Sequence, residues 1–464
     1  MINRKRLFVG SWIALVVTSF GFIIRALVLA EWGREFTLSQ EDLGWIAGAG
    51  LFPFAITIVL FSLVIDKIGY HTSIRIAFVG HVVSAIVTIC AGLIGDPFWV
   101  LFIGTVILAL SNGIVEAVIN PVTSTLYPKS KTHHLNILHA GWPGGLVLAG
   151  IIVISLGDAD WRWKVGLVLL PTFVYGAMLL NQKFPLNERV AAGVPYRDMI
   201  REIKRPLFLL LLAIMVPLAV TELGTDSWIT ALMENVLTSG IHPGWVLVYT
   251  SAIMLVLRFF AGPIVHRINP LGLLACSAFI ACLGLIWLSN AGAALGAVFA
   301  AATFYALGKT FFWPTTLGVV AEQFPKGGAL LLNTMGGMGM LAAGLLGAPI
   351  LGSIQDKVID QELQQRAPEV HQQVTDAERL GLLGAYNPLD NQAVQELPME
   401  QAEVVREVRS DSSQIALRYV AFLPALMLLC YIGLILYFRS QGGYKPVELE
   451  GEQATGGVEG PVEA

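Results

Sequence analysis

Twelve long apolar stretches restrict this chain to one architecture, because each can cross a bilayer as a helix. Crossing ~30 Å of hydrocarbon takes about 20 residues. The stretches lie at 7–30, 43–65, 73–94, 98–127, 136–157, 163–181, 207–233, 243–265, 270–290, 293–322, 328–354 and 416–438. Only 13% of the residues are charged, against roughly 25% in soluble domains. We expect an all-α integral membrane protein with twelve transmembrane helices.

The placement of basic residues predicts the orientation of these helices. The first stretch follows the basic segment Asn3–Arg6, and it is longer than the roughly 7–15 apolar residues of a signal peptide, so we interpret it as an uncleaved span. Lys and Arg then concentrate in segments on the N-terminal side of the membrane, above all at 182–205. Cytoplasmic loops collect these residues. We expect a multi-pass protein of the cell inner membrane with both termini cytoplasmic.

The polar linker at 182–205 divides the spans six and six. We expect N-terminal and C-terminal six-helix bundles at 1–181 and 206–439. The polar insertion at 355–415 would lie outside the cell as partial helix or a hairpin, and the tail at 440–464 would be disordered. An internal repeat favours two pseudo-symmetric halves: Glu116 and Lys309 each precede a proline by five residues, and Pro-Lys and Leu-Asn pairs follow in both halves.

Glu116 is an acid inside the apolar stretch 98–127. At helical spacing it belongs to a polar stripe that comprises Asn112, Glu116, Asn120, Thr123, Ser124 and Tyr127. A charged side chain at mid-bilayer costs at least ~2.5 kcal/mol, so such residues usually face a cavity or a partner. We expect Glu116 to line a cavity and to couple transport to protons. The alternative is a structural glutamate that is permanently protonated or salt-bridged.

The stretch 293–322 carries a counterpart stripe of Tyr305, Lys309 and Trp313. Lys309 occupies the repeat position of Glu116, which suggests that the two charges pair across the pseudo-two-fold axis in one state of the transport cycle. The alternative is a separate partner for each.

The stretch 207–233 adds Glu222 and Asp226 at helical spacing, together with Trp228. A rise of ~1.5 Å per residue from Pro206 places Glu222 in the outer part of the span. An entrance role or simple solvation therefore competes with substrate contact.

Two further cations lie within spans. Arg25, late in the first span, either contacts substrate or extends to the outer surface. Arg258, in the inner half of the eighth span, is a candidate anchor for a cytoplasmic gate. Trp142 could stack on a sugar face, whereas we interpret His139 as a hydrogen-bonded structural residue.

The sequence contains no motif for binding a metal or a cofactor. The four cysteines lie in apolar stretches without metal-ligand or disulfide spacing, and no nucleotide-binding motif is present. We expect a monomer that is not an enzyme, with no metal, no cofactor and no nucleic-acid partner.

Several motifs resemble those of the major facilitator superfamily. The segment SLVIDKIGYHT is similar to the gating signature of that superfamily and keeps Asp66, Lys67 and Gly69, although Ser62 replaces a glycine. DWRWK at 160–164 is similar to a Trp-Arg-Trp motif often found there. The resemblance implies two six-helix bundles that alternate access to a central site.

Within the superfamily, EAVINPVTSTLYP, TELGTDSW and FFWPTTLG resemble the fucose/glucose-galactose:proton symporters. This resemblance implies that Glu116 is the protonation site, and it carries over to the positions Asn120, Glu222, Trp228, Trp313 and Pro314. The chain departs from the family because its first span has no carboxylate and Trp142 stands near the position of a small amide.

The resulting hypothesis is a secondary active transporter that couples import of a sugar or sugar derivative to protons. One alternative is an organic-anion transporter that uses Arg25, Lys309 and Arg258. An alternative of another class is a non-transporting receptor whose partner binds the 355–415 segment.

Overall fold

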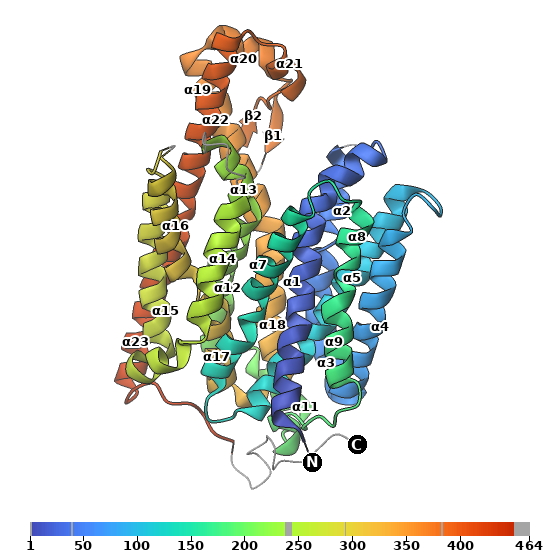
Figure 1. Cartoon of the computed structure of the whole chain (residues 1–464). Coiled ribbons are helices and arrows are strands. Elements are labelled where there is room, and N and C mark those ends of the chain that lie inside the picture. The colour runs from blue at the N-terminus through green and yellow to red at the C-terminus, as the bar shows by residue number, and fades with distance from the viewer. Residues whose placement is uncertain (1, 39, 237–243, 293, 382–383, 450–464) are drawn as a thin grey trace.

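The computed structural model of the chain describes residues 2–38, 40–236, 244–292, 294–381 and 384–449. Most of them belong to helices, and the long helices run side by side along one direction (Figure 1).

The helices before the linker form six passes. They are α1 Arg4–Glu35, α2 Gln40–Gly48 continued by α3 Phe52–Ile68, α4 Tyr70–Ile89, α5 Pro97–Leu126, α6 Lys131–His139 continued by α7 Gly141–Ser155, and α8 Trp161–Gly166 continued by α9 Leu169–Leu179. The linker itself holds two short helices, α10 Glu188–Ala191 and α11 Tyr196–Glu202.

In the described residues after the linker the helices form six further passes, and several contain a change of helix type. They are α12 Pro206–Ala219, the π-turn η1 Val220–Gly224 and α13 Thr225–Val236; α14 Gly244–Arg258; α15 Ala261–Leu288; α16 Leu295–Lys309 and α17 Phe312–Gln323; η2 Pro325–Gly327, α18 Gly328–Ala342, η3 Ala343–Gly347 and α19 Ala348–Arg366; and α22 Met399–Val420 with α23 Phe422–Ser440.

The all-α membrane fold predicted from the apolar stretches is confirmed. In the described part of the chain, 10 helices are long and apolar enough to cross a membrane. A further apolar helix, α14, has 15 residues, and the sixth pass is split into α8 and α9. The predicted twelve passes agree with this arrangement.

Local chemistry sets several helix boundaries. The Asp96 carboxylate accepts a hydrogen bond from the Phe98 N–H at 2.9 Å and caps α5, whose first residue is proline. Gly69 separates α3 from α4 with a φ of 83°, a backbone conformation that strongly favours glycine. The chain reverses direction sharply between these two passes, and this turn explains why the predicted gating motif has a glycine at position 69.

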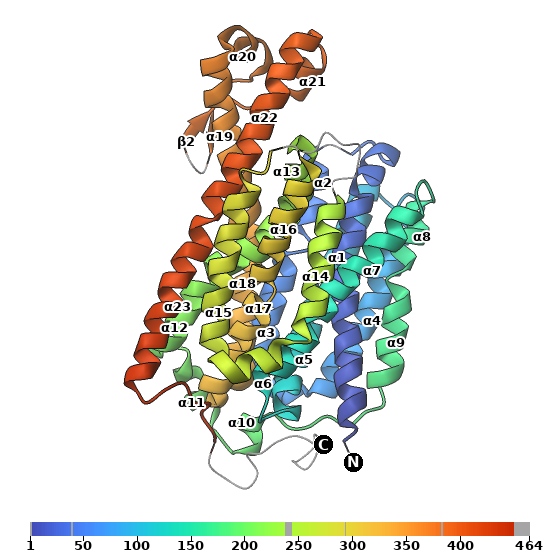
Figure 2. The same cartoon turned by 60° about the vertical axis from the view of Figure 1, so that its left-hand side comes forward.

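The insertion is a helical hairpin that projects beyond the bundle (Figures 1 and 2). Its long arms, α19 and α22, enclose a small apolar core that includes Ile359, Leu363, Val405 and Val408. Between the arms lie α20 Pro368–Val374, α21 Asn391–Gln395 and an antiparallel pair of strands, β1 Arg379–Gly381 and β2 Gly384–Tyr386. The described residues of this hairpin thus have an apolar core of their own.

The bundle has two distinct ends. We call the end that carries the hairpin the insertion end, and the opposite end the linker end. The start of α1, the end of α23 and the linker helix α11 lie at the linker end (Figure 1). The tail was expected to be disordered from residue 440, but residues up to 449 lie against α17: Tyr444 donates a hydrogen bond to Glu322 at 2.7 Å and the Val447 N–H donates to the Glu322 carbonyl at 2.8 Å.

Candidate functional site

A small cavity in the middle of the bundle is lined from both sides of the linker. Its lining comprises Phe54, Glu116, His139, Trp142, Glu222, Leu223, Arg258, Trp313 and Met340. The free space is about 20 Å³, which suffices for a single water molecule. The bundle is therefore closed around this site, and a ring-sized ligand needs the helices to separate.

Glu116 reaches the cavity without a cationic partner among the described residues. Its Oε2 accepts a hydrogen bond from the Asn120 Nδ2 at 2.7 Å, one helical turn further along α5. Its exposed fraction is 8%. The salt-bridged glutamate considered as an alternative is thus not the arrangement in this conformation.

Hydrogen bonds continue from Asn120 towards the second half of the chain. The Asn120 Oδ1 lies 2.9 Å from the His139 Nε2. The His139 carbonyl accepts from the Arg258 Nη1 at 2.5 Å, and the Arg258 Nη2 donates to the Glu222 Oε1 at 2.8 Å. His139, interpreted from the sequence as structural, therefore lies between the two carboxylates of the cavity. Its position at the last turn of α6 gave no sign of this contact.

Glu222 is held by groups from two other helices. It pairs with Arg258, and both side chains are buried. Its Oε2 also accepts a hydrogen bond at 3.2 Å from the Trp313 N–H, one of the free N–H groups in the first turn of α17. Glu222 lies in the π-turn η1 between α12 and α13, and its side chain lines the central cavity. Its depth in the membrane stays a prediction.

Lys309 forms an ion pair with Asp226, not with Glu116. In this conformation the two charges have separate partners, and their pairing in another state of the cycle stays a prediction. Both partners belong to the second half of the chain: Asp226 lies in the first turn of α13 and Lys309 ends α16. The Tyr305 hydroxyl of α16 also donates to the Thr221 carbonyl of η1 at 2.7 Å. The Lys309 Nζ also lies 4.8 Å from the centre of the Tyr305 ring.

Only some of the remaining residues that were predicted to contact substrate line the central cavity. Trp142 and Trp313 line the cavity, whereas Asn112 bonds to His81 at 3.0 Å inside the first half. His81 in turn lies 3.0 Å from the Tyr175 hydroxyl, so Asn112 completes a buried polar cluster away from the cavity. Trp228 belongs to α13, but its side chain is outside the described part of the chain. Arg25 lines a separate cavity.

The predicted gating residues lie at the linker end, with one exception. Asp66 pairs with Arg189 of the linker at 2.5 Å, Lys67 is exposed, and Gly69 forms the turn described above. Arg258 was expected at this gate, but it lies in the central cavity because its guanidinium is committed to Glu222 and to two carbonyls, His139 and Thr310.

Hydrogen bonds between α6 and α17 close the bundle at the linker end. The Thr132 hydroxyl donates to the Glu322 Oε1 at 2.5 Å, and the Asn136 Nδ2 donates to the Thr315 hydroxyl at 3.1 Å. Lys131 pairs with Glu188 of the linker at 2.7 Å. We call these contacts the linker-end seam. They join the first half of the chain to the second half and to the linker, and their opening would expose the cavity from this end.

Within the described residues, no group of three or more His, Cys, Asp or Glu side chains could hold a metal ion.

A family model described as the Major Facilitator Superfamily matches residues 11–348. The chain belongs to this superfamily. The match covers most of both halves of the bundle, including every residue that lines the central cavity. The protein is therefore a multi-pass transporter of the major facilitator type.

One curated relative is the gentisate transporter of Corynebacterium glutamicum, which is 25% identical over 262 residues. That match covers 53% of this chain and 56% of the relative, or about half the length of each.

Two solved structures show the same fold. The proton:xylose symporter XylE of E. coli matches with a TM-score of 0.68 at 13% identity, covering 92% of this chain and 94% of that chain. The E. coli fucose:proton symporter FucP matches with a TM-score of 0.59 at 14% identity, covering 88% of this chain and 98% of that chain. The predicted resemblance to sugar:proton symporters is thus confirmed for the fold.

Proposed function

We propose that this transporter couples the movement of a small organic substrate to protons, with Glu116 as the proton carrier. The observation that carries the proposal is a difference in charge pairing. Glu222 and Asp226 each face a cation, Arg258 and Lys309, whereas Glu116 accepts its side-chain hydrogen bond from the neutral Asn120. With Glu116 protonated, the negative charges of Glu222 and Asp226 are balanced by the positive charges of Arg258 and Lys309.

This balance links the proton to closure of the cavity. An unpaired carboxylate in a nearly dry cavity is costly, so closure favours neutral Glu116. When the cavity opens to water, the carboxylate can ionise and release its proton. Glu116 would therefore cross with a proton and release it on the other side, and substrate bound beside it would move in the same cycle.

A neutral sugar is the substrate class that the pairing of the cations favours. Arg258 and Lys309 are engaged by carboxylates of the protein itself, which leaves hydrogen-bonding groups and the faces of Trp142 and Trp313 for a ligand. Indole rings offer flat apolar surfaces with a polar edge, and such surfaces suit the apolar face of a sugar ring.

An organic acid is the second candidate, and the likeness to a gentisate transporter favours it. Gentisate is an aromatic carboxylate. Protonation of Glu222 would free Arg258 to bind a substrate carboxylate in its place, with the bidentate geometry that guanidinium groups offer. In this version, both Glu116 and Glu222 would exchange protons during the cycle.

Orientation and direction belong to the same proposal. The excess of Lys and Arg at the linker end supports a cytoplasmic position for that end and for both termini. The hairpin at 355–415 would then lie outside the cell, and proton-driven movement would be import.

The test compares Glu116→Gln with wild type in proteoliposomes. We expect the variant to lose accumulation driven by a proton gradient and to keep counterflow exchange, because glutamine mimics the protonated acid but releases no proton. Glu202→Gln is the matched control, since Glu202 pairs with Arg205 in the linker and should leave accumulation unchanged. Uphill uptake by Glu116→Gln would refute the proposal.

The substrate is found by thermal shift of the purified protein in detergent, because a ligand that binds the folded state raises its Tm. Neutral sugars, sugar acids and aromatic acids form the three arms. A rise with neutral sugars supports the sugar class. A rise with acids alone, lost in Arg258→Gln, would assign the organic-acid class and reject the sugar.

A further inference from the structure

Arg25 of α1 is a cation within a predicted membrane span. Among the described residues it has neither an ion-pair nor a hydrogen-bond partner. Other cations of the bundle differ: Arg258, Lys309 and Lys164 each face a carboxylate. A guanidinium without a counter-ion in this position is expensive, so the site is incomplete as it stands.

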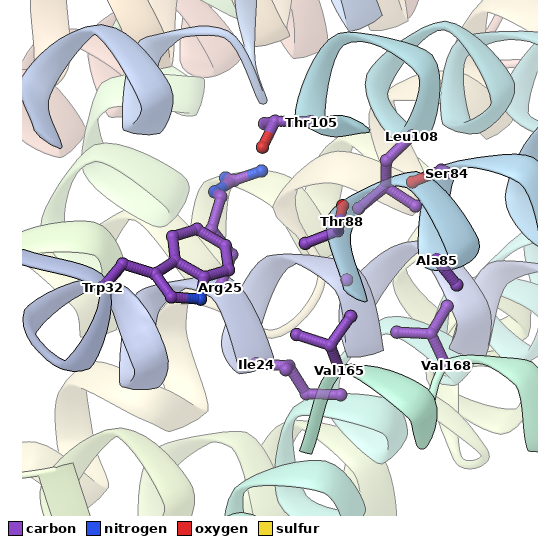
Figure 3. A pocket seen from close by; sticks show the side chains of 11 residues that line it. Ile24, Arg25, Trp32, Ser84, Ala85, Thr88, Thr105, Leu108, Val165 and Val168 are labelled. Atoms are coloured by element: carbon purple, nitrogen blue, oxygen red, sulfur yellow. The ribbon is translucent and has the colours of Figure 1, made fainter. Parts of the chain in front are cut away.

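The guanidinium lies next to an internal cavity between α1, α4, α5 and the α8–α9 pass (Figure 3). The side chains of Trp32, Thr88 and Thr105 line this cavity with Arg25. Its free space is about 30 Å³, enough for a water molecule or a ligand of similar size. Only a ligand of very few atoms fits.

The groups around the cavity are better suited to an anion than to a cation. Trp32 carries a buried indole N–H that has no hydrogen-bond partner. The hydroxyls of Ser84 and Thr105 donate to the carbonyls of Gly104 and Leu101, so they do not neutralise Arg25. The guanidinium therefore supplies a full positive charge and several free donors.

The α2–α3 break leaves room for this guanidinium. A Cβ atom added to Gly50 would lie 1.8 Å from the Arg25 Nη1, which is impossible without displacing the side chain. Arg25 thus packs against the backbone of the break on one side, while the cavity that it lines with α4 and α5 lies beside it.

We propose that the cavity beside Arg25 binds a small monovalent anion, the size of chloride or of a carboxylate head group. This anion would act as the counter-ion that no described residue provides, as Glu222 does for Arg258. The inference goes beyond the proposed proton coupling, because it concerns neither Glu116 nor the central cavity. The anion has two sources: an inorganic halide, or the carboxylate of a substrate.

The test is thermal unfolding of the purified full chain at constant ionic strength, with sodium gluconate replaced stepwise by sodium chloride or by sodium formate. We expect the Tm of wild type to rise saturably with at least one small anion, and the rise to be absent in Arg25→Gln. Arg75→Gln is the matched control, because Arg75 is exposed on α4, and it should keep the full response.

The two arms identify the source. A rise with chloride supports an inorganic counter-ion, and a rise with formate alone supports a carboxylate head group. No saturable rise in wild type, or an equal rise in Arg25→Gln, overturns the proposal. If Arg25→Gln does not fold, crystals of wild type soaked in bromide decide: an anomalous peak beside Arg25 supports the site, and its absence at saturating bromide overturns it. Glu116→Gln should keep the anion response, so this proposal and the proton proposal can fail independently.

Discussion

Lys309 and Asp226 form an ion pair in which both side chains are buried, and such a pair is stabilising only while both charges are present. Removing one partner leaves a buried charge uncompensated, at a cost of about 3–5 kcal/mol, whereas replacing both with apolar side chains is often neutral. The same reasoning does not apply to Glu116, whose neutral form needs no cation. The charged residues buried in the bundle therefore contribute differently to stability according to their pairing.

We expect Lys309→Met to lower the free energy of unfolding by about 3 kcal/mol or more, and Lys309→Met combined with Asp226→Leu to recover most of that loss. Thermal unfolding of wild type, both single variants and the double variant completes the cycle. Losses that simply add in the double variant would contradict the ion pair.

At the scale of helices, the approach of α6 to α17 depends on Gly318. A Cβ atom at this glycine would lie 2.3 Å from the Thr132 Oγ1, so the two helices touch there because residue 318 has no side chain. Closure of the linker-end seam thus requires a residue without a side chain at position 318 of α17. A larger residue there should hold the two halves of the chain apart.

Gly318→Val is expected to shift the population towards a conformation open at the linker end. A cysteine introduced near the seam should then react faster with a water-soluble maleimide than it does in the otherwise wild-type chain. Gly433→Val is the control, because a Cβ atom at Gly433 meets no atom within 4 Å. Equal reaction rates in both variants would reject a role for the contact at Gly318.

The linker adds a pH dependence to this closure. Burial raises the pKa of Glu188 above its ordinary value of 4.5, and the charge of Lys131 opposes the rise. The closed seam therefore holds the Glu188 proton more tightly than the open, hydrated state does. Closure is favoured as the pH falls towards 4.5 and is weakened as the pH rises through the raised pKa.

Distance measurements between labels on either side of the seam, from pH 8 down to pH 5, should show the closed population growing. Lys129 and Glu322 line the same cavity as Glu188, so Glu188→Gln is needed to assign the effect. An unchanged pH response in Glu188→Gln would assign it to another group.

For the whole molecule, the hairpin at the insertion end is separable from the transport bundle. Its apolar core is distinct from the main core of the bundle. Arg366 of α19 pairs with Asp411 of α22 at 2.8 Å, so these two residues face each other across the two arms and mark a position at which the hairpin can be shortened. The central cavity and the linker-end seam lie outside the hairpin. A transporter should therefore function without it, whereas a receptor that uses it should not.

Replacing residues 368–409 with a short Gly-Ser linker is expected to leave substrate uptake within about twofold of wild type. Uptake per folded molecule, with folding checked by size-exclusion chromatography, is the readout. Loss of uptake in a chain that still folds would show that the hairpin takes part in transport.

Sequence patterns alone predicted much of the fold and part of the candidate site. The apolar stretches fixed the membrane class because the length needed to cross a bilayer is a property of the helix itself. Glu116 could be assigned to a cavity for a similar reason, since a mid-span acid must avoid lipid wherever its helix packs. The resemblance motifs led to the superfamily that the comparison confirmed.

The partners of the charged residues were decided only by the tertiary structure. Lys309 bonds to Asp226, and Arg258 reaches Glu222 and His139. These contacts depend on how far each helix is rotated and shifted against neighbours remote in sequence, and helical periodicity leaves both quantities free. The sequence thus determined which residues must leave the lipid, because that cost is local, and the packing of the helices determined which residues they meet.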